Sequence, residues 1–441
     1  MTALPPIDKV NSNYLARTAG SKPDTTLRRL KRSWRRGWDS IVHALYVPVA
    51  ALMRGAGYRF VTISNPHRIG HLAAEIDWYL KEIALGGIEP ARTILLLKPG
   101  RAANTVLLDI WRAHILVMSD GIRRRLLRPL LDFPSLKLDL GISVVGIDSA
   151  AIYQKTLNRW HGREPVARLP DELVSDARRK LRELGVPENG WFVCVHAREG
   201  GYSPGDEHVH AHRNSAIGSY TIAMDEIVAR GGYCIRMGDP TMAKLEPRPG
   251  VIDYATSPFK SEALDIFLCA NARFLLGNTS GLCMIATMFN VPSVLTNMIP
   301  CGAGYGVYPG DLSILKKLCD AEGNILRFDK LFESAVSSFR YAGLYEEYGL
   351  TAIGNTPEEI RDVTVEMLDR LAGTFETTPD DEARQARFRG LLRPHHYCYA
   401  VTSRIGRDFL RRHAHMFDDS AGTSMPPEKV VSPDGIEPST Y

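Results

Sequence analysis

The stretch of sequence that decides the fold class reads Phe192-Val193-Cys194-Val195-His196-Ala197-Arg198-Glu199-Gly200-Gly201-Tyr202. Its apolar run predicts a buried strand, and the glycine pair predicts a turn directly after the polar residues. Open α/β sheets bind ligands at the carboxyl ends of their strands. Arg198 could therefore hold the oxygens of a diphosphate, with His196 orienting it, or it could close a domain interface instead.

The same alternation of apolar runs and helical patterns continues on both sides of this strand. It predicts parallel sheets covered by helices, and hence an α/β fold with two Rossmann-like domains. We expect strands at residues 60–64, 94–97, 115–118, 142–145, 191–195, 233–237, 274–276 and 293–296.

The length of 441 residues is enough for two domains and flanking segments. We expect a first Rossmann-like domain at residues 58–165 and a second at 185–350, with a helix at 171–184 between them. C-terminal helices are expected at 351–419, a flexible lead at 1–26 and a disordered tail at 420–441.

Residues 27–57 predict a basic amphipathic helix, because tryptophans and aliphatic residues recur at three- and four-residue steps opposite arginines. Its most apolar part is shorter than the ~20 residues of a membrane-spanning helix. We expect it to lie against an anionic membrane surface, or to pack on the protein's own surface. The net charge of +4 is small for this length, and the basic residues cluster in this one segment, which disfavours nucleic acid as a partner. The basic residues are Arg28, Arg29, Lys31, Arg32, Arg35 and Arg36.

The seven cysteines form no CxxC pair, which favours a reducing compartment. The first residues also lack the features of a signal peptide. We therefore expect a cytoplasmic protein that is peripheral on the inner face of the cell membrane.

Three further segments of the second half place polar residues where strands end or helices begin. The start of a helix after Asn278 favours an anion, although Ser-Gly is also a common helix cap. Residues 234–240 end a strand and residues 260–262 begin a helix, so their polar groups should converge on one crevice. The residues expected to bind the ligand are Arg213, Asn214, Arg236, Gly238, Asp239, Ser261, Glu262, Thr279, Ser280 and Gly281.

Histidines raise two further possibilities. His71 follows a predicted strand and begins a helix, so it should face the cleft between the domains as a general base, or serve as a polar loop residue. His208, His210 and His212 alternate, and on an extended strand they would face the same way and could hold zinc. No cysteine or second carboxylate cluster accompanies them at metal-site spacing, so we expect no bound metal.

The segments 195–199, 235–240 and 277–281 resemble a bacterial family of glycosyltransferases from surface-polysaccharide loci. The resemblance runs from Trp191 to Pro300 and extends to residues 68–72 and 355–360. It implies a GT-B-like fold, distantly similar to fucosyltransferases and heptosyltransferases, in which an HxR arginine or a Ser/Thr-Gly turn holds the donor diphosphate. This chain departs from the family at His212, where relatives carry an aromatic residue before Arg-Asn. The metal-binding DxD motif of GT-A enzymes is not evident, which agrees with a metal-independent donor site.

The resemblance implies transfer of a sugar from a nucleotide-sugar donor in the C-terminal domain to a glycan or lipid-linked acceptor in the N-terminal domain. Arg198, His196 and His71 would be catalytic, and no cofactor is implied beyond the donor. A sugar-nucleotide epimerase is an alternative, since a fold does not fix a reaction. A noncatalytic scaffold of a polysaccharide assembly complex is another. The basic helix argues against the epimerase, and nucleotide binding would argue against the scaffold.

Overall fold

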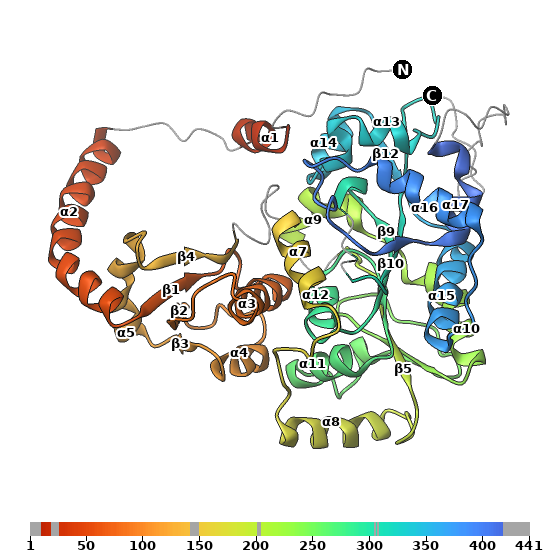
Figure 1. Ribbon diagram of the computed structural model, residues 1–441, viewed down its shortest axis with the longest axis horizontal. Coiled ribbons are helices and arrows are strands. Elements are labelled where there is room, and N and C mark those ends of the chain that lie inside the picture. The colour runs from red at the N-terminus through yellow and green to blue at the C-terminus, as the bar shows by residue number, and fades with distance from the viewer. Residues whose placement is uncertain are drawn as a thin grey trace.

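The computed structural model describes residues 10–18, 26–141, 150–200, 204–303, 306 and 308–417. Figure 1 shows two lobes side by side, each built around a sheet. The chain is therefore an α/β protein with two Rossmann-like domains, as the sequence predicts.

The N-terminal sheet is parallel throughout and has the strand order β3-β2-β1-β4. Strands β1 and β2 supply its buried centre, where Phe60 and Ile94 are almost inaccessible to solvent. The strands are β1 (Tyr58–Thr62), β2 (Arg92–Leu96), β3 (Leu116–Met118) and β4 (Lys137–Asp139).

Helices surround this sheet, and the longest of them, α2, runs along the outer side of the N-terminal lobe (Figure 1). Helix α3 is buried on most sides and also packs against α12 (Gly281–Met288) of the C-terminal domain. No helix within the described ranges has the length and apolar character needed to cross a bilayer. The helices are α2 (Thr26–Gly55), α3 (Ile69–Ala84), α4 (Thr105–Arg112), α5 (Gly121–Leu127), the 3-10 helix η1 (Arg128–Asp132) and α7 (Ala150–Trp160).

The C-terminal sheet has the order β13-β10-β9-β8-β5-β6-β7, and all its neighbouring strands are parallel. Every residue of β5 is buried, as expected for a strand covered on both faces. The strands are β5 (Phe192–His196), β6 (Tyr233–Arg236), β7 (Val251–Ile252), β8 (Leu275–Gly277), β9 (Ser293–Met298), β10 (Leu312–Leu315) and β13 (Arg404–Ile405). A separate antiparallel pair joins β11 (Lys317–Cys319) and β12 (Thr351–Ile353).

Capping residues mark the starts of several helices of the C-terminal domain. Helix α15 starts with a capping box between Thr356 and Glu359, followed by a proline in the first turn. The helices are α8 (Asp171–Glu183), α9 (Pro204–His210), α10 (Thr221–Ala229), α11 (Glu262–Asn271), α12 (Gly281–Met288), α13 (Phe328–Phe332), α14 (Ala342–Glu347), α15 (Pro357–Ala372), α16 (Pro379–Leu391) and α17 (Arg407–Arg412).

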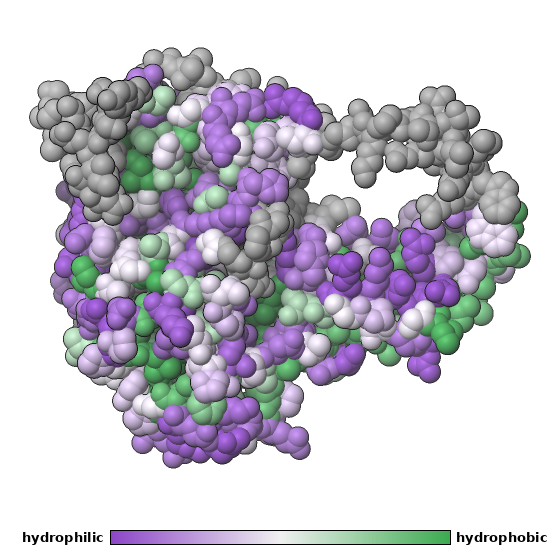
Figure 2. Space-filling view, turned by 180° about the vertical axis from the view of Figure 1, so that it is seen from behind, coloured by the Kyte–Doolittle hydropathy of each residue, from purple (hydrophilic) through white to green (hydrophobic). Residues whose placement is uncertain are grey.

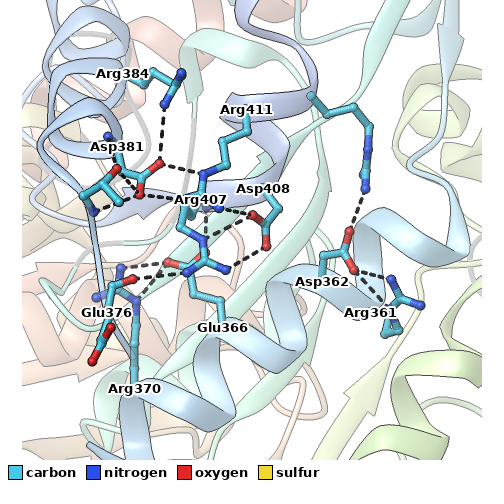
Figure 3. Close-up of polar contacts among 12 residues, drawn as sticks. Arg361, Asp362, Glu366, Arg370, Glu376, Asp381, Arg384, Arg407, Asp408 and Arg411 are labelled. Atoms are coloured by element: carbon cyan, nitrogen blue, oxygen red, sulfur yellow. Dashed lines mark hydrogen bonds and ion pairs between the residues drawn. The ribbon is translucent and has the colours of Figure 1, made fainter. Parts of the chain in front are cut away.

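An ion-pair network ties the C-terminal helices together (Figure 3). Asp381 of α16 accepts hydrogen bonds of 2.7 Å from Arg411 of α17, and these hold the pKa of Asp381 well below its usual range. Glu366 of α15 accepts from the backbone N–H of Arg407 at 2.6 Å. These contacts lie between α15, α16 and α17, so the network is structural.

The structure corrects the sequence prediction near the N-terminus, and two further predictions fall on residues that it does not describe. Within the expected flexible lead, α1 (Val10–Thr18) is helical, and its Asn11 donates to the carbonyl of Ser338 at 2.8 Å. The expected strand at 142–145 and the expected tail at 420–441 lie outside the described residues. The region expected to hold C-terminal helices contains α15, α16 and α17, and β13 separates α16 from α17.

Candidate active site

Arg198 lies two residues beyond the end of β5, at the carboxyl edge of the C-terminal sheet. Its backbone N–H donates to the side-chain oxygen of Asn278 at 2.8 Å, and its guanidinium donates to the side-chain oxygen of Asn214. The carboxylate of Glu207 is 4.0 Å from the guanidinium, and 17% of the Arg198 side chain is exposed. The guanidinium is thus oriented in part by the amide of Asn214 and keeps some access to solvent.

The side chain of Asn278 connects Arg198 with residues 213–215 at the carboxyl edge of the sheet. Besides accepting from Arg198, its amide donates to the carbonyl of Arg213 at 2.9 Å and to the hydroxyl of Ser215 at 3.0 Å. The Asn278 side chain is fully buried. The guanidinium of Arg213 in turn donates to the carbonyl of Thr279 at 2.7 Å. Arg198, Arg213 and Thr279 are thereby brought together.

Helix α12 begins directly after Thr279 and Ser280. Ser280 is its N-cap residue, yet its hydroxyl caps no backbone N–H of the helix, and this buried oxygen has no hydrogen-bond partner among the residues that the structure describes. Buried hydroxyls normally have a partner, so an orphan of this kind calls for an explanation. The N–H groups of a helix start and its dipole favour an anion there.

Glycines allow the two domains to approach each other closely at the start of α12. A Cβ atom on Gly70 would lie 2.9 Å from the Cα of Gly281, which no ordinary side-chain contact allows. The sequence predicts that Gly281 admits a ligand, whereas its close neighbour in the structure is the backbone of the N-terminal domain. The beginning of α3 therefore abuts the beginning of α12.

His71, the residue after Gly70, forms a pair with Glu75 one turn along α3. The His71 Nδ1 atom is 2.7 Å from Glu75 Oε1, and 17% of the His71 side chain is exposed. Glu75 is fully buried and also accepts from the backbone N–H of Ser64 at 3.0 Å. Glu75 thus fixes the orientation of the His71 ring at the junction between the domains.

Buried groups around Arg198 have shifted pKa values. Burial, aided by the charge of Arg213, lowers the pKa of His212 to about 3, and both its ring nitrogens are buried without hydrogen-bond partners. Burial lowers the pKa of His196 to about 4, and its Nδ1 contacts the carbonyl of Met237 at 3.2 Å. Burial also lowers the pKa of Lys316 to about 8. At neutral pH both histidines are neutral and the lysine is mostly charged.

Lys316 holds the polypeptide that carries Arg213 and Asn214. Its ammonium donates to the carbonyl of His212 at 3.0 Å and to that of Asn214 at 2.6 Å. Lys316, Asn278 and Glu75 are not among the site residues predicted from the sequence. Their partners lie far away in the sequence or one helical turn away within a buried helix, and no local pattern marks such contacts.

Other predicted ligand-binding residues are engaged in contacts within the protein. Arg236 lies between the carboxylates of Asp253, at 3.0 Å, and Glu199, at 3.4 Å, and is 1% exposed. Asp239 accepts from the backbone and hydroxyl of Thr241. Gly238 follows β6, where a Cβ atom would lie 2.5 Å from the sulfur of Met242. Arg236, Gly238 and Asp239 therefore stabilise the loop that follows β6 beside the site.

Ser261 and Glu262 stand at the start of α11, where the sequence predicts a helix. The Ser261 hydroxyl caps α11 by accepting from the N–H of Leu264. Glu262 reaches the N-terminal domain, where its carboxylate accepts from the N–H of Thr105 at 2.7 Å and from its hydroxyl at 2.6 Å. Glu262 therefore joins the domains.

The histidine segment is helical, whereas the zinc alternative assumed an extended strand. His208 and His210 belong to α9, and His212 to the short 3-10 helix η2 (Ala211–Arg213). Within the part of the chain that the structure describes, no group of three or more His, Cys, Asp or Glu side chains is arranged to hold a metal ion.

Comparisons with known proteins place the chain near one group of solved structures. No family model and no curated protein matches the sequence. A glycosyl transferase of family 9 from Veillonella parvula is 12% identical, covers 59% of this chain and 85% of its own, and has a TM-score of 0.39. The heptosyltransferase WaaC of E. coli, solved with ADP, is 11% identical over 58% of this chain and 90% of its own, with a TM-score of 0.32.

A third match is the iron-containing dodecameric heptosyltransferase TibC, solved with ADP-D-beta-D-heptose. It is 13% identical over 56% of this chain and 60% of its own, with a TM-score of 0.34. The heptosyltransferase-like resemblance predicted from the sequence is thus found among solved structures. Identities and TM-scores this low describe a distant resemblance, so any function must be argued from the residues of the site.

Proposed function

We propose that the protein is a metal-independent glycosyltransferase that takes a sugar from a nucleotide-sugar donor bound by its C-terminal domain. The observation that carries the proposal is the meeting of Arg198 and Arg213 with the start of α12, where the hydroxyl of Ser280 is buried without a partner. Two guanidinium groups, a helix N-terminus and an orphan hydroxyl suit a diphosphate.

In this proposal Arg198 and Arg213 bind the diphosphate, and the backbone and hydroxyls from Thr279 to Gly281 add hydrogen bonds. The acceptor oxygen attacks the anomeric carbon while the bond from that carbon to the diphosphate oxygen breaks. The guanidinium of Arg198 stabilises the charge that develops on the departing diphosphate, as a metal ion would. His71, oriented by Glu75, takes the proton of the acceptor hydroxyl.

The acceptor in this proposal is a glycan or a lipid-linked sugar of surface-polysaccharide biosynthesis, held against the N-terminal domain. Helix α2 places the protein on anionic lipid at the cytoplasmic face of the membrane. Support for this comes from the six basic residues within 28–36, whose side chains lie outside the described residues, and from the exposed apolar residues that follow them.

Thermal unfolding against a panel of nucleotides and nucleotide sugars, in buffer with EDTA, tests the proposal. One nucleotide and its sugar conjugates should raise the midpoint temperature of unfolding, by an amount that grows with ligand concentration. The Arg198→Ala variant should lose that shift, while Arg182→Ala, an exposed arginine of α8, should keep it.

The reaction products then distinguish a transferase from an epimerase and from a noncatalytic scaffold. A transferase releases nucleoside diphosphate, with acceptor or slowly with water. An epimerase converts one nucleotide sugar into another without acceptor, and a scaffold gives neither reaction. No stabilisation by any member of the panel would refute the donor site.

A further inference from the structure

Helix α2 carries apolar side chains on two different faces. Tyr46, Ala50 and Met53 point inward and pack in a small core formed with β1, β2 and η1. A second set stays in contact with solvent, with exposed fractions from 41% to 73%. Its spacing of three and four residues places it on one side of the helix over about 21 Å. This exposed stripe consists of Trp38, Ile41, Leu45, Val49 and Leu52.

Helix α5 repeats this arrangement beside α2. Ile122 and Leu126, one turn apart, are 76% and 58% exposed, and no residue of α5 is buried. The hydroxyl of Tyr46 donates to the carbonyl of Leu126 at 2.7 Å, which places the two helices next to each other. Large apolar side chains so exposed, and so close together, mark an interaction surface.

Charge indicates the kind of partner. Arg123, Arg125 and Arg128 are exposed in and directly after α5, and Arg54 is exposed near the end of α2. Arginines that flank exposed leucine, isoleucine and tryptophan suit the boundary between acyl chains and anionic headgroups. Figure 2 shows apolar surface along the outer margin of the N-terminal lobe, where α2 lies, away from the C-terminal lobe.

We infer that α2 and α5 form one bilayer-binding surface, in which Ile122 and Leu126 of α5 enter the same anionic leaflet as the stripe of α2. This inference rests on the proposed membrane association of α2. A single helix in the interface leaves the protein free to rotate about the helix axis, whereas a second point of insertion fixes its orientation. The N-terminal domain then lies directly on the membrane, where a lipid-linked acceptor would be found.

Co-sedimentation with vesicles of phosphatidylglycerol and phosphatidylcholine tests the two helices separately. The double variant Ile122→Ser/Leu126→Ser should bind at least about tenfold more weakly than the wild type, because two side chains no longer enter the apolar layer. Trp38→Ser/Leu45→Ser in α2 should weaken binding in the same way. Leu371→Ser, an exposed leucine of α15, is the matched control and should bind like the wild type.

A fluorescent label reports insertion directly. All seven native cysteines are buried, so an environment-sensitive dye can be attached selectively to Ile122→Cys. Its emission should shift to the blue with anionic vesicles but not with phosphatidylcholine alone. The same dye on Ser175→Cys, an exposed position of α8, should show no shift.

The outcomes distinguish this inference from the proposal on which it rests. If the α5 double variant bound like the wild type and the dye stayed in water, the inference would be overturned, while loss of binding in the α2 variant would still support membrane association. If neither variant changed binding, both would fail. Donor binding in the thermal assay is independent of either result.

Discussion

In the proposed donor site, a side-chain amide helps to orient the guanidinium of Arg198. Its guanidinium contacts the amide of Asn214, and the carboxylate of Glu207 stands 4.0 Å away. By contrast, Arg236 is enclosed by two carboxylates and is almost inaccessible. Of the two strand-end arginines, Arg198 is the more accessible to solvent, with 17% of its side chain exposed against 1% for Arg236.

The first prediction concerns Arg198. Lysine keeps the charge but loses the planar fork, so Arg198→Lys should retain donor binding better than turnover. Arg198→Ala should lose both, with a fall in turnover on the order of a hundredfold or more. Thr279→Val should weaken donor binding and spare turnover at saturating donor. Steady-state kinetics with the donor found by thermal shift measure these effects, and a loss of only a few-fold in a folded Arg198→Ala would return Arg198 to a structural role.

The second prediction concerns Glu75, which acts through His71. Glu75→Gln should lower turnover and leave donor affinity unchanged, because the ring of His71 loses the carboxylate that orients it. In a double-mutant cycle, Glu75→Gln should cost little further turnover once His71 is alanine. Additive losses would show that Glu75 supports α3 in some other way, since a purely structural defect does not depend on His71.

At the scale of elements, α2 combines a basic start with an exposed apolar stripe. The third prediction is that Arg32→Glu, Arg35→Glu and Arg36→Glu together release the protein from anionic vesicles, since each basic residue near such a surface contributes ~1 kcal/mol. Reversal of Arg178, Lys180 and Arg182 on α8 is the matched control and should leave binding intact. Unchanged co-sedimentation of the α2 variant would mean that this segment packs on the protein itself.

The elements that sequence alone predicts best are those whose own residues carry the signal. Strands β5, β6 and β8 begin with continuous apolar runs, as buried parallel strands do. Strands β7 and β13 have only two residues each, too few for any periodicity. The same limit applies at the site: Arg198 stands beside its strand in the sequence, whereas Asn278 acquires its role only when residues 213–215 come to lie beside it.

Glu359 links three elements and gives the fourth prediction. At the start of α15 it contacts His413 after α17, at 2.6 Å, and Lys317 of β11, at 3.6 Å. Burial alone would raise the pKa of Glu359, but the hydrogen bond from His413 and the charge of Lys317 lower it from 4.5 to about 2. A lowered carboxyl pKa stabilises the folded protein above the unfolded value, and this stability is lost as the pH falls from 4.5 toward 2.

The free energy of unfolding should therefore differ between wild type and Glu359→Gln most at neutral pH. Up to about 3 kcal/mol of that difference should disappear as the pH falls through this range. Denaturant titrations of both proteins at several pH values measure it. A difference that did not change with pH would mean that the carboxylate's charge contributes nothing to stability.

On the scale of the whole molecule, the two domains meet through backbone at Gly70 and Gly281 and through the carboxylate of Glu262 on Thr105. The proposed reaction needs this junction, because the donor groups belong to one domain and His71 to the other. The separation of α3 from α12 thus determines whether His71 can reach an acceptor aligned with the donor.

The fifth prediction changes that separation. In Gly70→Val the added carbons would meet the backbone of Gly281, where even a Cβ atom would lie 2.9 Å from its Cα, so α3 and α12 must move apart. Overpacking of this kind costs about 1–3 kcal/mol, and the thermal midpoint should fall. Turnover should fall more than donor affinity, because the displaced helix carries His71 while Arg198 and Arg213 stay in the C-terminal domain. Gly218→Ala, at a position with open space, should change neither quantity. Wild-type turnover in a stably folded Gly70→Val would show that catalysis does not depend on this contact, and the general base would have to be sought elsewhere than at His71.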